Sequence, residues 1–578
     1  MSIFHMAKDH SIKCALIAGT ALAGVALTVG PALAGDHGAF AEVLRTELGL
    51  SGSQTATLHG PGKTGAGAID GESQILNGFY DRQEFRAIWF TNGGPTAKAK
   101  LFLDRLGRAG EHGLEPEDYG YKSLTAGVKS FSSGNRAALE VAMSRAFARY
   151  AADVNAGRIH PNRRVPGVYI RPVRPDPERL LVAAATTKDF AKYIDTLSPR
   201  TPQYARLLKA MAYYRGIARN GGWQPAGSGP TLKPGMSDPR VAQIKARLRI
   251  VGDLKATDTT PNLYTAELVT AVKRFQYRHG LEQDGNVGKT TLTAMNVPVA
   301  MRIDQMALNL ERRRWMPDDL GDKYVFVNIA DQYLKLVTRA HSAKPKTIHT
   351  ARVVVGRRYF QTPIFSGIMR FARFNPHWNV PQSIARKEML PKLKKNPGYL
   401  AANKYMLLTR PLDNSSEISA SSVDWNGLSR SNFPYFIRQK PGPWNALGEV
   451  IFMFPNPHNI FIHDTTSRSL FGRNVRSFSH GCIRLHNPHA FGMLVLKANG
   501  GWTRKRMAEL VKTRKEKQIF LKVQLPVHIT YLTAWSNKDG THHFRRDIYK
   551  RDTRLRAVLI RAIATARKSL DKGPGRSG

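Results

Sequence analysis

The chain has 578 residues, which is enough for three or four domains of ordinary size. Hydrophobic residues make up 42% of it, and this excludes a collagen-like chain or one that is disordered throughout. The net charge of +44 favours a polyanionic partner, although a basic composition with a solvated charged surface explains it equally well.

The N-terminus has the pattern of a secretory signal peptide, predicted over residues 1–34. Lys8 and Lys13 precede an apolar run at 14–31, and a small-x-small site ends at Ala34. An uncleaved membrane anchor is the alternative. Export argues against nucleic acid as a partner, so the positive charge points to a cell wall or membrane surface.

Cysteine usage singles out one residue. Cys14 leaves with the signal peptide, so Cys482 is the only cysteine of the mature chain. Exported proteins meet an oxidising environment, in which an unpaired thiol is a liability unless it is used. A disulfide scaffold is therefore excluded.

The first half of the mature chain divides into a linker and a helical block. Residues 35–70 include a Gly/Ser/Thr-rich run and predict a flexible linker. Residues 72–225 carry apolar residues at three- and four-residue spacing, which predicts a helical scaffold without a catalytic cluster.

Residues 228–298 form a compact unit. Asp238-Pro239 predicts a helix start, and His279-Gly280 predicts a helix end. The sequence AVKRFQYRHGLEQDGNVGKTTLTAMN (271–296) resembles the three-helix peptidoglycan-binding domain. A unit that only braces its neighbours is the alternative.

Strand patterns begin near residue 320 and continue to 546. β-Branched, alternating segments occur at 324–330, 333–338, 351–356, 361–367, 449–456, 460–466 and 519–546. The irregular stretch at 394–446 predicts a lid or binding segment. Residues 550–578 predict a basic amphipathic helix that docks on the protein rather than on a membrane.

The sequence SFSHGCIRL (477–485) has the parts that thiol chemistry needs. Gly481 lets a substrate approach Cys482, and the backbone N–H groups of both are candidate oxyanion donors. Arg484 is expected on the same strand face as the thiol, where its charge would favour the thiolate.

His463, at the end of a predicted strand, is the candidate base for Cys482. His480 ranks second because its ring would have to fold back from the same tight turn. A metal site is not predicted, since the spacing of the nearby candidates offers no tetrahedral set: these are His458, His463, Asp464, His480 and His486.

These residues resemble the H…[S/T]-x-G-C-x-R signature of the L,D-transpeptidases. RQEFRAIWF, NPHWNVPQSIA, NIFIHDTTSRSLF and LPVHITYLTAW extend the resemblance to the large periplasmic enzymes of Gram-negative bacteria. The implied fold is multidomain α+β: a helical scaffold, a small peptidoglycan-binding domain, and a β-rich catalytic domain at 320–546 with a capping insertion at about 380–446.

The resemblance also implies the chemistry. Cys482 would attack the carbonyl of meso-diaminopimelate in a tetrapeptide stem, D-Ala would leave, and a second stem would accept the acyl group in a 3→3 cross-link. His463 would move the protons, and no cofactor is implied. Ser479, His480 and Arg484 would shape the site.

The remaining assignments are less direct. Asp464 is a possible orienter of the His463 ring. Asn375, Trp378 and Trp425 are candidates for the substrate groove, with packing roles as the alternative.

Other functions stay open at this point. Water as acceptor would make the protein an L,D-carboxypeptidase or a cross-link-cleaving hydrolase, and a protein amine would make it an anchoring enzyme. A non-catalytic peptidoglycan-binding protein is the alternative from another class. The residues before Cys482 do not choose among acceptors.

Overall fold

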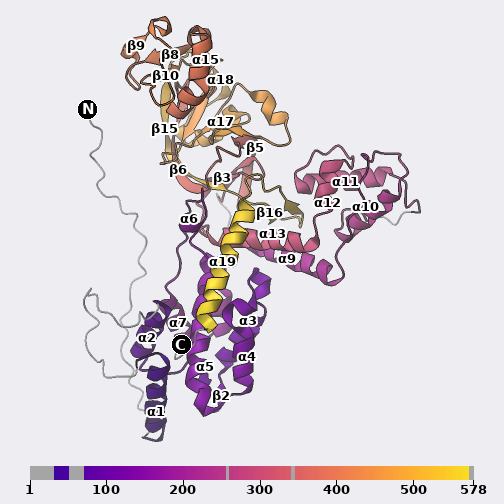
Figure 1. Cartoon of the computed structure of the whole chain (residues 1–578), viewed down its shortest axis with the longest axis vertical. Coiled ribbons are helices and arrows are strands. Elements are labelled where there is room, and N and C mark those ends of the chain that lie inside the picture. The colour runs from indigo at the N-terminus through magenta and orange to yellow at the C-terminus, as the bar shows by residue number, and fades with distance from the viewer. Residues whose placement is uncertain (1–30, 51–70, 256–258, 340–344, 572–578) are drawn as a thin grey trace.

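The computed structural model describes residues 31–50, 71–255, 259–339 and 345–571. Figure 1 shows a helical scaffold at one end of the molecule, a β-rich domain at the other end, and a small helical unit at the side. The predicted fold class is confirmed. Residues 1–30 of the predicted signal peptide lie outside the described residues.

The scaffold is built around one long helix that is buried on nearly all sides. α5 contributes Phe147 to an aromatic cluster with Trp89 and Phe102, whose ring centroids lie 5.3 to 5.7 Å apart. The elements of this part are α1 (Pro31–Glu47), α2 (Gly71–Arg82), β1 (Phe90–Thr91), β2 (Gly94–Pro95), α3 (Ala97–Gly107), α4 (Tyr121–Lys129), α5 (Arg136–Ala156), α6 (Pro161–Arg164), α7 (Pro177–Thr186) and α8 (Phe190–Asp195).

The linker predicted over 35–70 is wrong for its first part. α1 is helical to Glu47, and its apolar residues Phe40, Ala41 and Leu44, with Leu48 directly after it, are buried in the scaffold core. These positions have helical spacing, so the signal was present. Residues 51–70, which contain the Gly/Ser/Thr-rich run, lie outside the described residues.

Glu140 on α5 holds the chain at the start of the β1–β2 hairpin. Its buried carboxyl accepts the backbone N–H groups of Ile88 at 2.6 Å and of Trp89 and Phe90 at 3.0 Å each. Tyr80 Oη also donates to it, at 2.9 Å. The carboxyl group therefore satisfies several donors that have no access to water.

We expect Glu140→Ala to lower the local unfolding free energy of the scaffold by about 3 kcal/mol, because it leaves buried donors unpaired. Hydrogen exchange of the α5 amides would measure the loss. The exposed Glu111 gives the matched control, Glu111→Ala. Equal protection of the α5 amides in both variants would contradict the prediction.

Two antiparallel helices carry the small unit at the side of the molecule. α9 (Pro202–Arg219) packs against α13 (Val299–Arg314) through Tyr204, Leu207 and Leu310. α9 therefore lies apart from the main scaffold core, although the 72–225 block includes it. Figure 1 shows the unit beyond the ends of this pair.

The small unit has the predicted three helices, α10 (Pro239–Ile250), α11 (Ala266–His279) and α12 (Lys289–Met295). Asp238 accepts the Arg240 N–H at the start of α10, and Gly280 ends α11 with φ 62°. Val241, Ile244 and Phe275 lie in its core. The turn residues therefore act as their sequence context predicts.

The β-rich domain is a closed barrel. Its strand order is β13-β5-β14-β12-β11-β6-β15-β3-β4, and pairing of β4 with β5 closes it. The strands are β3 (Lys323–Asn328), β4 (Tyr333–Thr338), β5 (Lys346–Gly356), β6 (Phe365–Phe374), β11 (Val450–Met453), β12 (Ile462–His463), β13 (Ser477–Ser479), β14 (Ile483–Leu485) and β15 (Lys517–Thr530).

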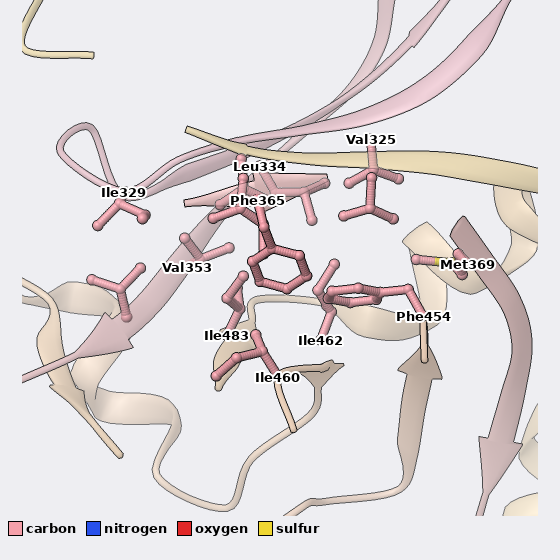
Figure 2. Close-up of a cluster of buried hydrophobic side chains, with 14 of the residues drawn as sticks. Val325, Ile329, Leu334, Val353, Phe365, Met369, Phe454, Ile460, Ile462 and Ile483 are labelled. Carbon is pink, nitrogen blue, oxygen red and sulfur yellow. The ribbon is translucent and has the colours of Figure 1, made fainter. Parts of the chain in front are cut away.

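Alternation along these strands separates a core face from an outer face. Figure 2 shows Val325, Leu334, Val353, Phe365, Ile462 and Ile483 converging inside the barrel. Residues one position away from these side chains point to the opposite face. Position 463 on β12 and position 484 on β14 are therefore on the outer face.

A capping lobe, residues 378–439, interrupts the barrel between β6 and β11. It has its own core, which includes Leu393, Leu407 and Ile437. Its elements are β7 (Trp378–Asn379), α14 (Gln382–Ile384), a π-helical turn (Ala385–Met389), α15 (Leu390–Lys395), α16 (Tyr399–Ala402), β8 (Tyr405–Leu408), β9 (Glu417–Ile418) and β10 (Phe436–Gln439).

The C-terminal helix joins the barrel to the scaffold, as Figure 1 shows. Arg312 pairs with Asp552 at 2.5 Å near its start, and Arg567 pairs with Asp118 at 2.5 Å near its end. None of the described helices is long and apolar enough to span a membrane. The last elements are α17 (Pro488–Val495), α18 (Arg504–Lys512), β16 (Ala534–Ser536), β17 (His542–Phe544) and α19 (Arg551–Asp571).

Candidate active site

Two short parallel strands bring the predicted nucleophile and base together. His463 on β12 is the register partner of Arg484 on β14, and the Ile483 N–H donates to Phe461 O at 3.0 Å. Cys482 directly precedes β14 and is partly exposed. The structure therefore places Cys482, His463 and Arg484 at one point of the barrel surface.

Burial keeps the thiol protonated at neutral pH. It raises the pKa of Cys482 to about 11, against the opposing effects of the Phe461 N–H and the Arg484 charge. Arg484 does favour the thiolate, as its spacing predicts, but desolvation outweighs it. The thiol Sγ lies 3.5 Å from Asn459 O.

Burial also keeps the His463 ring neutral. It lowers the pKa of His463 to about 3, and the positive charge of Arg484 acts in the same direction. The backbone carbonyl groups of Asp464 and Leu447 act in the opposite direction. A neutral imidazole on the strand next to a neutral thiol is in the protonation state that a base needs to accept the thiol proton during nucleophilic attack.

Among the described residues, the Asp464 carboxylate makes no hydrogen bond to this ring. Its Oδ2 accepts the Glu449 N–H at 2.9 Å and lies 3.7 Å from an Arg468 guanidinium nitrogen. The backbone carbonyl groups of Leu447 and Asp464 act to raise the pKa of His463, but within the described residues the ring Nδ1 has no hydrogen-bond partner.

The turn that carries Cys482 is closed by Ser479. Ser479 Oγ donates to Cys482 O at 2.6 Å and accepts the Gly481 N–H at 3.1 Å. Gly481 has φ 120°, a conformation that favours glycine. The prediction of an oxyanion donor at Gly481 is therefore wrong, because that N–H is already used. Within the described chain no protein acceptor is found for the Cys482 N–H, which remains the candidate donor.

Thr362 braces the same turn from a distant part of the sequence. Its Oγ1 donates to Gly481 O at 2.7 Å and accepts the Gly356 N–H at 3.0 Å. Tyr549 and Arg551, at the start of the C-terminal helix, hold this region in turn: Tyr549 Oη donates to Gly356 O, and Arg551 donates to Thr362 O at 2.9 Å. Local sequence patterns contained no signal for these contacts.

We expect Thr362→Val, which keeps the shape of the side chain, to reduce the activity of the site about tenfold and to lower stability by about 2 kcal/mol. The valine leaves Gly481 O and the Gly356 N–H without a partner. Initial rates and urea unfolding would measure the two effects. The exposed Thr347→Val on β5 is the control, and equal rates for both variants would contradict the prediction.

His480 connects the turn to the capping lobe rather than to the thiol. Its Nε2 lies 2.6 Å from Glu388 Oε1 on the π-helical turn, and Arg357 donates to the same carboxylate at 2.9 Å. Burial acts to raise the pKa of Glu388, but hydrogen bonds and charge from His480 and Arg357 lower it overall. His480 is therefore placed to position the lobe.

The predicted groove residues have packing roles. Asn375 is buried, and its Nδ2 donates to Leu510 O at 2.9 Å. Trp425 lies in the core of the capping lobe, where Nε1 donates to Ala420 O at 2.7 Å. Trp378 packs against that core beside Tyr405. The groove assignment is therefore wrong for Asn375 and Trp425.

Comparisons with known families match three segments of the chain. Residues 74–211 match "Scaffold domain", residues 237–295 match "Putative peptidoglycan binding domain", and residues 322–494 match "L,D-transpeptidase catalytic domain". Strand β15 lies beyond the third match but between β6 and β3, so the barrel extends further than the matched range.

A curated relative is a "Putative L,D-transpeptidase" of Haemophilus influenzae. It is 31% identical over 257 residues, which are 44% of this chain and 50% of the relative. The match thus spans half the length of that protein.

Two solved structures are weakly similar. An L,D-transpeptidase from Xylanimonas cellulosilytica is 13% identical with a TM-score of 0.17, over 52% of this chain and 98% of that one. One from Stackebrandtia nassauensis is 15% identical with a TM-score of 0.20, over 52% and 97%. Structural similarity at this level does not support the assignment of a family or a function.

Proposed function

The chain carries an L,D-transpeptidase catalytic domain together with a scaffold domain and a peptidoglycan-binding domain, and we propose that it forms 3→3 cross-links in peptidoglycan through a cysteine acyl-enzyme. The observation that supports this most is that Cys482, directly before β14, and His463, on the parallel strand β12, come from neighbouring strands of the barrel.

The acylation step starts from the neutral Cys482 thiol and the neutral His463 imidazole. Cys482 Sγ attacks the carbonyl carbon of the third stem residue, meso-diaminopimelate, while His463 takes the thiol proton. The Cys482 N–H faces the developing oxyanion. The C–N bond to D-Ala then breaks, and the His463 proton leaves on the D-Ala amine. A thioester to Cys482 remains.

The second step regenerates the enzyme. An amine on the meso-diaminopimelate of another stem attacks the thioester, and His463 takes a proton from that amine. The C–S bond breaks and the proton returns to Cys482 Sγ, leaving an amide between two third residues. Such a substrate places the reaction outside the cytoplasm, in the periplasm, where the net charge of +44 would assist contact with an anionic wall.

The decisive experiment incubates the purified protein with disaccharide-tetrapeptides and identifies the products by mass spectrometry. Dimers that have lost one D-Ala support transpeptidation. Tripeptide monomers alone would replace the proposal with an L,D-carboxypeptidase, since water would then be the acceptor. Unchanged substrate would favour a non-catalytic wall-binding protein.

A carbapenem is expected to acylate Cys482, because its strained amide offers the thiol the same type of carbonyl carbon. Ring opening retains all atoms, so intact-mass spectrometry should show one added equivalent of the drug. A Cys482→Ala variant is the control and should show none. Unmodified wild-type protein after long exposure would contradict an accessible, activated thiol.

A further inference from the structure

A large cleft separates the three-helix unit from the outside of the barrel. It has a volume of about 1020 Å³, which is slightly above the usual range for ligand sites. We call it the interdomain cleft. Its walls are the end of α11 with the following loop, β4 and β5 of the barrel, the segment 472–478, and the β16–β17 hairpin.

The walls of the interdomain cleft are held at a defined separation. Arg545 donates to Asp331 Oδ1 on the barrel at 2.7 Å and to Arg278 O on α11 at 2.8 Å. Arg278 donates to His542 O in the hairpin at 3.1 Å. These bonds join all three parts, so the cleft is a built feature of the fold.

Positive charge dominates the lining. The cations are Lys335, Arg352, Arg473, Arg476, Arg545 and Arg546, and the acids are Asp331 and Glu282. Asp331 is occupied by Arg545. Among the residues that the structure describes, none of the other five cations forms an ion pair. A concave surface with uncompensated charge of one sign concentrates ligands of the opposite sign.

Arg476 shows that this charge is part of the wall itself. The residue is buried, and its guanidinium donates to Gln332 O at 3.0 Å and Arg473 O at 2.9 Å, with no carboxylate partner among the described residues. Desolvation lowers its pKa. Backbone carbonyl groups hold the Arg476 guanidinium in place but do not neutralise its charge. An anion bound in the cleft would neutralise it.

Aromatic rings lie between the cations. Trp535 stacks on His543 with ring centroids 5.0 Å apart, and Tyr277, which is 48% exposed, meets His543 edge-on at 5.2 Å. Arg476 lies 5.3 Å from the ring centre of Tyr333. Flat apolar surfaces beside guanidinium groups suit a ligand that has both carboxylates and apolar surface.

The interdomain cleft is connected to the catalytic turn. Segment 472–478 lines the cleft and continues into Ser479 and Cys482. β5 contributes Arg352 to the cleft and pairs through Val354 with Arg484 of β14. Neighbouring strands lie about 5 Å apart. A ligand in the cleft therefore lies on the same outer surface as the thiol.

We propose that the interdomain cleft binds an acidic stem peptide of peptidoglycan, with the stem carboxylates on its guanidinium groups. This rests on the proposed function. The proposed function concerns the cross-link that the enzyme forms, and the cleft adds how the enzyme holds the peptidoglycan polymer during that reaction. A stem bound between the three-helix unit and the barrel would keep a polymeric substrate on the enzyme while a neighbouring stem reaches Cys482.

The test uses two exposed arginines of the cleft. Arg473→Glu with Arg546→Glu reverses both charges, and the control Arg163→Glu with Arg164→Glu makes the same change on α6, outside the cleft. All four substitutions are placed in the full chain with Cys482→Ala, so that nothing turns over. Arg473→Gln with Arg546→Gln is the milder variant if the reversal impairs folding.

Binding is measured by co-sedimentation with purified sacculi and with sacculi whose stems an amidase has removed. We expect the control to bind intact sacculi better than stripped glycan, and the cleft variant to bind intact sacculi about tenfold more weakly than the control, since each exposed charge pair makes only a small contribution to binding. Equal binding by the two variants would overturn the proposal. Equal loss on intact and stripped sacculi would also overturn it, because the ligand would then be the glycan.

A second measurement separates this inference from the proposed function. With Cys482 retained, the wild type and the Arg163→Glu, Arg164→Glu control should convert soluble disaccharide-tetrapeptide at equal rates, because α6 belongs neither to the catalytic turn nor to the cleft. Inactive wild-type protein would refute the proposed function. Active wild-type protein, together with undiminished binding of the cleft variant to sacculi, would refute only the cleft.

Discussion

Replacing Cys482 with alanine is expected to lower the rate of product formation by at least about 10⁴-fold, because the acyl group then has no nucleophile to join. The substitution removes a small side chain from the edge of the barrel core, so the fold should persist. Mass spectrometry of tetrapeptide reactions would measure the loss as the absence of both tripeptides and dimers.

The same variant should keep its binding properties. Co-sedimentation with sacculi and the thermal unfolding temperature should match those of the wild type, which distinguishes loss of chemistry from loss of structure. Cys482→Ser tests the chemistry more finely: a hydroxyl group has nearly the same size but is a much weaker nucleophile. Residual turnover within tenfold of wild type in Cys482→Ala would rule out Cys482 as the nucleophile.

Replacing His463 with glutamine is expected to reduce kcat/KM by about 10³-fold, the range expected for loss of a general acid–base group. The pKa of Cys482 is raised to about 11, so the thiolate is rare at pH 7. The pKa of His463 is lowered to about 3, so its ring is an unprotonated base above that pH. The thiol therefore needs His463 to take its proton during attack.

This pair makes a clear prediction for pH dependence. A raised thiol pKa keeps Cys482 protonated below about pH 11, and a lowered imidazole pKa keeps His463 neutral above about pH 3. Neither group titrates between pH 5 and 9, so kcat/KM should be nearly flat there. Alkylation by iodoacetamide, which needs free thiolate, should instead rise about tenfold per pH unit over the same range.

His486→Gln provides the matched control, since His486 is an exposed histidine four residues after Cys482. It should leave kcat/KM within twofold of the wild type. A bell-shaped profile centred near pH 6.5 would contradict the neutral pair and would indicate a thiolate–imidazolium pair instead. Equal activity of His463→Gln and His486→Gln would exclude His463 as the base.

Local patterns in the sequence were sufficient for the domain order and for the two central residues. The Asp238 cap, the Gly280 helix end and the stripe of Val241 and Ile244 depend on contacts within a few residues, so spacing alone predicts them. Cys482 and His463 belong to a motif that can be read along the chain, and strand alternation predicted that Arg484 lies near the thiol, whose pKa the Arg484 charge acts to lower. The linker prediction missed α1 because the Gly/Ser/Thr-rich run after it dominated the segment.

The tertiary structure alone decided what surrounds those residues. Thr362 and Tyr549 brace the Gly481 turn from positions far along the chain, and Glu388 reaches His480 from the capping lobe. Asn375 and Trp425, which resembled groove residues, are buried instead. Such contacts depend on the closure of the barrel between β4 and β5, and local periodicity contains no information about which distant segments that closure brings together. The sequence by itself therefore singled out the candidate nucleophile, the candidate base and the order of the domains, whereas the protonation of the pair, the bracing of the turn and the interdomain cleft were decided by burial and long-range packing.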